Sequence, residues 1–172
     1  DNIPVAMACA QAADRSGKDL ITAIAAAYEI QCRLCDAASI RARGWDHVTY
    51  GAFSSAICCS MLLGLTHSES VNALGIIGVS SPALRQTRAG VISMWKGCAF
   101  ADVSKRAVFA AMLAKNGVTG PENIFEGAFG FIKLVSGSIT LGAFGGEGGE
   151  RFKILDTYIK YYPVEYHAQS AV

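Results

Sequence analysis

The chain has 172 residues, of which 52% are apolar, and its formal net charge is +1. A chain of this length and composition can bury one sizeable core. Its near-zero charge, together with the lack of a basic face, an RNP-like aromatic motif or zinc-finger spacing, argues against nucleic acid as a partner. We therefore expect a compact domain whose partner is not a nucleic acid.

Cysteine usage indicates a reducing compartment. Of the six cysteines, four lie inside apolar helical patterns, namely Cys32, Cys35, Cys58 and Cys59, which is typical of reduced core thiols. Cys32 and Cys35 form a CxxC pair, but no second pair and no nearby histidine completes a redox or metal site. We expect a cytoplasmic protein, or one of the mitochondrial matrix if the source is eukaryotic, without a metal or another cofactor.

The spacing of apolar residues predicts a mainly α fold. Helical periodicity covers residues 5–13, 19–40, 48–64, 70–79 and 99–115, with short helical pieces at 122–125 and 129–135. Residues 48–66 carry no formal charge, yet serine, threonine and glycine interrupt the run. They predict a buried helix packed through small residues rather than a membrane span, and no secretion signal is expected at the N-terminus.

Cations gather between the fourth and fifth predicted helices. Arg85, Arg88 and Lys96 fall within residues 80–96, a span without an acidic residue, and Lys96 stands at the entrance of the Ala-rich helix over 99–115. Such a run of cations either pairs with distant carboxylates or binds an anionic ligand. The sequence leaves both alternatives open.

A polar and aromatic segment, from Gly44 to Gly51, precedes the uncharged helix. Asp46 can cap that helix, while the imidazole of His47 can either face a cleft or lie at the surface. His67 precedes the next predicted helix, and we expect it to be a solvated loop residue.

Composition changes near residue 150. The glycine-rich tract over residues 137–149 lacks the Lys-Ser/Thr ending of a Walker motif and predicts a mobile linker. Residues 152–162 are rich in β-branched and aromatic side chains and are followed by Pro163, which predicts a strand. We expect residues 1–149 to be part of a large, bundle-like helical domain with this linker, and residues 150–172 to begin a small α/β lid domain.

Four stretches of the sequence carry a resemblance to a known family. They are Trp45-Asp46-His47-Val48, Ser93-Met94-Trp95-Lys96, LAKNGVTGPENIFEG over residues 113–127, and KYYPVEYHAQ over residues 160–169. In these stretches, and along essentially its whole length, the chain resembles the MmgE/PrpD family. Its ending is most similar to the branch that dehydrates 2-methylcitrate, and the chain looks like an internal piece of a longer protein.

The resemblance implies a hydro-lyase of propionate catabolism. Such an enzyme removes water from 2-methylcitrate or a similar tricarboxylate and gives a cis-aconitate-type product. The resemblance implies that His47, Lys96 and Lys160 are catalytic and that His167 lies near the lid boundary, where it would contact the substrate. It also implies a homodimer that works without a metal and has its site between the helical and lid domains.

Arg85 and Arg88 are assigned to substrate carboxylates from their charge alone. Two alternatives stay open for the function as a whole. The same fold can serve a decarboxylase or an epimerase of a related di- or tricarboxylate, or the chain can be a non-catalytic helical interaction module. The enzyme hypothesis predicts that His47 and the cations surround one cavity.

Overall fold

A computed structural model describes the whole chain, from Asp1 to Val172. Five α-helices form its body. They are α1 (Asn2–Ala12), α2 (Gly17–Ala37), α3 (Val48–Leu63), α4 (His67–Ser80) and α5 (Trp95–Lys115). The predicted mainly α fold is therefore confirmed. None of these helices combines the length and the apolar character needed to cross a bilayer.

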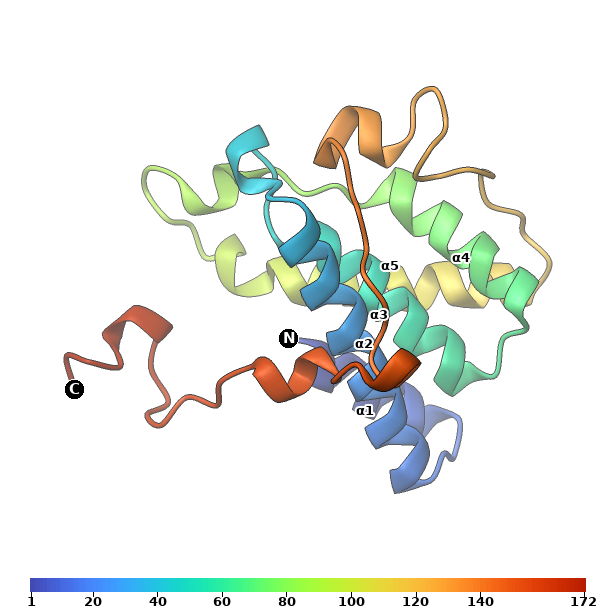
Figure 1. Ribbon diagram of the computed structural model, residues 1–172, viewed down its shortest axis with the longest axis horizontal. Helices are drawn as coiled ribbons and strands as arrows, with labels where there is room; N and C mark the ends of the chain where they lie inside the picture. The colour runs from blue at the N-terminus through green and yellow to red at the C-terminus, as the bar shows by residue number, and fades with distance from the viewer.

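Helix α3 is the centre of the fold (Figure 1). It packs against the other four α-helices, and 13 of its 16 residues are buried. Small side chains let its neighbours approach closely: a Cβ added to Gly51 would lie 2.4 Å from the ring of Phe100 in α5. Because it is covered on almost all sides, with only Met61 exposed, this helix needs no polar face. The uncharged run in the sequence is thus a core helix, as predicted.

Capping boxes set the start of two helices. At α2, Ser16 Oγ accepts a hydrogen bond from the N–H of Asp19, and Asp19 Oδ2 accepts one from the N–H of Ser16. Thr66 and Glu69 exchange the same two bonds at α4. Each box satisfies N–H groups that a helix start leaves free. Helix α4 therefore begins at His67 and not at residue 70, so the prediction that His67 is a loop residue is wrong.

Aromatic side chains from the segment after α5 close the core. Phe125 and Phe131 pack on Phe53 of α3, with ring centroids 4.9 and 5.0 Å apart. A single π-helical turn, η3 (Ile132–Ser136), follows Phe131 and matches the helical piece predicted there. The piece predicted at residues 122–125 is a turn instead.

The strand predicted over residues 152–162 is wrong. Residues 152–162 contain only the short 3-10 turn η5 (Lys153–Asp156), with η4 (Glu147–Gly149) before it and η6 (Tyr166–Ala168) after it, all joined by irregular backbone (orange-red to red in Figure 1). A strand needs a neighbour that pairs its N–H and C=O groups. The single β-bridge of the chain joins Trp45 and Leu84, far from this segment. The division into a helical and a lid domain stays a prediction.

Candidate active site

Two loops far apart in the sequence are hydrogen-bonded to each other at the start of α3. The N–H of Asp46 donates to the carbonyl of Ala83, and the N–H of Arg85 donates to the carbonyl of Gly44; each N···O distance is 2.8 Å. This pairing brings the cation-rich loop that follows α4 next to His47.

The loop after α4 contains the 3-10 turn η2 (Arg85–Arg88). Because a 3-10 helix has three residues per turn, Arg85 and Arg88 share one side of it, and Gln86 and Thr87 point elsewhere. The two arginines line one cavity, whereas Gln86 and Thr87 line another. The local backbone therefore separates the charged side chains from the neutral ones.

The first cavity, of about 450 Å³, gathers most of the predicted site residues. Its lining residues are Arg41, Trp45, Asp46, His47, Arg85, Arg88, Ile92, Lys96, Glu165 and His167. Five of the six predicted site residues are among them. Lys160 is not, since it lies on exposed backbone between η5 and η6. We call this space the cationic cavity, because four of its lining residues are arginine or lysine.

Asp46 is the buried anion of the cationic cavity. Its side chain is 1% exposed, and its Oδ2 atom pairs with Nε of Arg88. Its Oδ1 atom accepts a hydrogen bond of 3.1 Å from the N–H of Val48, the first residue of α3. The cap position itself is held by His47, which makes no side-chain capping bond, so the predicted cap by Asp46 is wrong: its carboxylate satisfies the first helical N–H through an Asx turn instead. A buried carboxylate with both oxygens engaged is held rigidly.

His47 lies beside this carboxylate with part of its ring exposed. Its Nδ1 atom is 3.0 Å from Oδ1 of Asp46, and its Nε2 atom is 3.6 Å from Oδ2 of Asp1. Burial lowers the pKa of His47, and the opposing effect of Asp46 does not fully compensate. The imidazole is therefore neutral at neutral pH and can accept a proton.

Three cations of the cavity have no anionic partner in the chain. Arg41, Arg85 and Lys96 form no ion pair, and all three line the same space. Arg41 belongs to η1 (Arg41–Arg43), and Lys96 lies in the first turn of α5. Unpaired cations that converge on one cavity are suited to bind a ligand with several carboxylates.

The C-terminal stretch is anchored on α2 before it reaches this cavity. Glu29 of α2 is 4% exposed and accepts hydrogen bonds from the N–H groups of Gly145 (2.7 Å) and Lys153 (2.6 Å). It also pairs with Arg33. Burial alone would raise the pKa of Glu29, but these bonds outweigh it and lower the pKa. We call Glu29 with its three partners the Glu29 clasp.

Beyond the clasp, the chain returns to the cationic cavity. Residues 155–163 are exposed, and then Glu165 and His167 line the cavity. The exposed segment carries Lys160. The cavity is thus built from three regions of the sequence: residues 41–47, residues 85–96 and the end of the chain.

Arg41 and Glu165 are not among the site residues predicted from the sequence, and Asp46 is predicted only as a helix cap. Arg41 ends a helical pattern, where a basic residue is common whatever the function. Glu165 was noted only within a family motif. The useful signal was the adjacent pair Asp46-His47, since an acid next to a histidine can orient or charge the imidazole.

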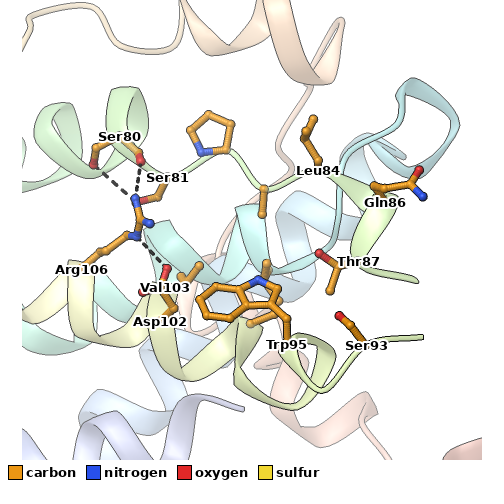
Figure 2. A pocket seen from close by; sticks show the side chains of 14 residues that line it. Ser80, Ser81, Leu84, Gln86, Thr87, Ser93, Trp95, Asp102, Val103 and Arg106 are labelled. Atoms are coloured by element: carbon orange, nitrogen blue, oxygen red, sulfur yellow. Dashed lines mark hydrogen bonds and ion pairs between the residues drawn. The ribbon is translucent and has the colours of Figure 1, made fainter. Parts of the chain in front are cut away.

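The second cavity, of about 480 Å³, lies along α5 and the loop after α4 (Figure 2). Its charged residues, Asp102 and Arg106, already bind each other at a distance of 2.8 Å. Arg106 also donates to the carbonyl of Ser80 at 3.1 Å. The indole of Trp95 forms part of its wall and lies between Val103 and Thr87 in Figure 2. This cavity offers no unpaired charge, so the cationic cavity is the stronger candidate for a site.

Metal-ligating side chains do not cluster in this fold. No group of three or more His, Cys, Asp or Glu side chains could hold a metal ion. All six cysteines are free thiols. Burial raises the pKa of Cys35 to about 11, so this thiol of the CxxC pair is protonated at neutral pH.

Comparison with known proteins gives the family. The model of the MmgE/PrpD N-terminal domain matches residues 1–142. The chain belongs to the MmgE/PrpD family. A 2-methylcitrate dehydratase from Escherichia coli is 30% identical to this MmgE/PrpD chain over 167 residues, which cover 90% of the chain and 32% of that protein.

Two fungal proteins are also similar to this MmgE/PrpD chain. The alkylcitrate dehydratase phiI of a fungal species is 35% identical over 157 residues, covering 89% of the chain and 30% of that protein. The cis-aconitate decarboxylase-like protein oryM of Aspergillus oryzae is 28% identical over 119 residues, covering 67% and 24%. The chain spans about a third of the length of the two dehydratases.

Proposed function

We propose that this chain carries part of the active site of a hydro-lyase. Its substrate would be 2-methylcitrate or a similar tricarboxylate, and its product a cis-aconitate-type alkene. The observation that supports this most is the cationic cavity, which places His47 beside Arg41, Arg85, Arg88 and Lys96. The dehydratases among the relatives are named for 2-methylcitrate and an alkylcitrate, which are tricarboxylates.

The proposed reaction needs a base and a set of cations. Neutral His47 takes the proton from the carbon next to a carboxylate, and the electron pair of that C–H bond forms the alkene as the C–O bond breaks. The departing hydroxyl group takes a proton from an acid, for which Lys96 and His167 are the candidates, and leaves as water. Cations stabilise the enolate-like charge that develops on the carboxylate.

The remaining assignments rest on the family resemblance. We propose that Lys160 joins the site and that His167 contacts the substrate. The working enzyme would be a metal-independent homodimer of the cytoplasm or mitochondrial matrix, with a role in propionate catabolism. One relative is named as a mitochondrial 2-methylcitrate dehydratase.

Dehydration can be tested directly with 2-methylcitrate, because the product is a conjugated alkene that absorbs ultraviolet light. We expect His47→Ala and Lys96→Ala each to lower kcat/KM by about 100-fold or more, as is typical for the loss of an acid–base group. His67→Ala is the matched control, since His67 begins α4 and does not line the cavity. Unchanged turnover in both cavity variants would contradict the proposed site.

Decarboxylation is the second candidate reaction, because one relative is named as cis-aconitate decarboxylase-like. It leaves a different product and releases carbon dioxide. Analysis of products from a panel of di- and tricarboxylates separates dehydration, decarboxylation and epimerisation. A protein that turns over none of them would favour the non-catalytic interaction module.

A further inference from the structure

The four cations of the cationic cavity differ in what they already bind. Nε of Arg88 pairs with Oδ2 of Asp46, and the two side chains are 30% and 1% exposed. Arg41, Arg85 and Lys96 line the same cavity without an ion pair. The four positive charges are therefore not equally available to a ligand.

Arg88 is held in place by the burial of its partner. The other oxygen of Asp46 accepts the N–H of Val48 over 3.1 Å, and the backbone N–H of Asp46 donates to Ala83 over 2.8 Å. Asp46 therefore cannot turn towards water. A buried carboxylate without its cation is strongly unfavourable. A ligand can still reach the Nη atoms of Arg88, but the positive charge of this guanidinium is already balanced by the buried Asp46 carboxylate, so it has less to gain from a ligand anion than the unpaired cations.

The ligand class in this inference rests on the proposed function. We infer that the four cations of the cavity have two different roles. Arg41, Arg85 and Lys96 bind the three carboxylates of the tricarboxylate, and Arg88 is a positioning residue that acts through Asp46. This removes Arg88 from the substrate-binding residues expected from the sequence and adds Arg41. Each of the three unpaired cations can meet one carboxylate of such a ligand, while the Glu165 carboxylate that also lines the cavity accepts the N–H of His167 at 2.7 Å.

Asp46 links Arg88 to the proposed base. Oδ1 of Asp46 lies 3.0 Å from Nδ1 of His47. Loss of the Arg88 charge frees the Asp46 carboxylate and alters the environment of His47, while the three unpaired cations keep their places. Loss of Arg88 is therefore expected to lower kcat, and loss of Arg41 is expected to raise KM.

The two roles can be separated by binding and by turnover. Citrate serves as the probe in calorimetric titrations of the protein, and 2-methylcitrate serves as the substrate in steady-state kinetics. Arg41→Gln should weaken citrate binding about tenfold or more and raise KM, because a charge-assisted hydrogen bond is lost. Arg88→Gln should change the citrate Kd less than about threefold but lower kcat. Arg43→Gln is the matched control, since Arg43 lies in the same turn as Arg41 but outside the cavity.

A double variant tests whether Arg88 acts through Asp46. The kcat of the double variant, Asp46→Asn with Arg88→Gln, should be no lower than the kcat of the more damaging single variant. The reason is that each single change already breaks the same Asp46–Arg88 pair. Arg88→Lys keeps a cation beside Asp46 and should restore most of kcat. The lysine variant also decides the question if Arg88→Gln does not fold.

Each outcome bears on a different conclusion. Equal weakening of citrate binding by Arg88→Gln and Arg41→Gln, additive effects in the double variant, or no citrate binding by the wild type overturns the inference. The expected binding pattern without dehydration of 2-methylcitrate would remove the proposed function and the catalytic effect of Arg88, and would leave the assignment of Arg41, Arg85 and Lys96 to carboxylate binding. Dehydration with an unchanged KM in Arg41→Gln would remove the inference and leave the function.

Discussion

Replacement of Glu29 by glutamine should release the C-terminal stretch from α2 while the helical core stays folded. The Glu29 carboxylate accepts the N–H groups of both Gly145 and Lys153 and pairs with Arg33, whose side chain is 10% exposed. Residues 155–163 are exposed, and beyond them the chain reaches the cationic cavity. The Glu29 clasp anchors this stretch to α2 together with the ion pair between Lys153 Nζ and Asp36 Oδ2, which are 2.9 Å apart.

The size of the effect follows from the bonds lost. A hydrogen bond to a charged group contributes about 1.5–3 kcal/mol. Glutamine keeps one oxygen acceptor but loses the charge and the second acceptor, so we expect local opening to become easier by about 2 kcal/mol. That corresponds to roughly a 30-fold larger open population.

Amide hydrogen exchange measures this local opening. In Glu29→Gln, exchange at the amides of Gly145 and Lys153 should be about 30-fold faster, while the amides of α3 keep their protection. Glu147→Gln is the matched control, because that exposed carboxylate accepts only the N–H of Phe144, over 3.3 Å. It should change exchange by about threefold at most.

Two results would refute this reasoning about the clasp. One is unchanged exchange at both anchored amides, and the other is an equal loss of protection in α3, which would mean global unfolding. The pH dependence gives an independent check. Because the pKa of Glu29 is lowered from 4.5, its stabilising effect is complete above that pH and is lost as the pH falls through its folded value.

Titration and packing offer further tests. The imidazole of His47 should titrate below 6.5 in NMR spectra, and lower still in Asp46→Asn, since burial lowers its pKa and Asp46 opposes this. Because the pKa is lowered in the folded state, neutral His47 contributes to the stability of the fold above pH 6.5, and this contribution is lost as the pH falls through the folded pKa. A higher titration midpoint of His47 in Asp46→Asn than in the wild type would contradict the assignment. In urea unfolding, Gly97→Ala should raise the free energy of unfolding by about 0.5–1 kcal/mol, because its Cβ meets open space. Gly51→Ala should lower it by about 1–3 kcal/mol, because its Cβ would lie 2.4 Å from the ring of Phe100; equal effects of the two changes would contradict the packing.

Helices were predictable from the sequence because their signals are local. Apolar spacing located all five α-helices, and the uncharged run over residues 48–64 was correctly read as a buried helix. Helix starts were less well placed. The helix expected from residue 19 begins at Gly17, and Asp19 is the third helical residue of a capping box whose cap is Ser16. Both residue types favour a helix start, and geometry decides which one occupies the cap.

Residues 152–162 have the composition of a strand but no second strand to pair with, and the prediction of a strand there is therefore wrong. The Ile, Thr and aromatic side chains of this segment fit a sheet, but sheet formation needs a second segment at hydrogen-bonding distance. In this chain the segment is instead tied at Lys153 to Glu29 of α2, more than a hundred residues earlier. No local pattern in the sequence contains that contact.

The sequence by itself determined which residue types were available to the site and on which elements they stand: His47 before the buried helix, Lys96 at the start of α5 and two arginines in one turn. The tertiary structure decided which of them meet, since the hydrogen bonds from Asp46 to Ala83 and from Arg85 to Gly44 bring two distant loops together. It also decided that Arg88 is paired, that Arg41 joins the cavity and that Lys160 does not line it. The reason is physical: periodicity and capping depend on neighbours a few residues away, whereas the convergence of charges depends on contacts between segments that no short stretch of sequence specifies.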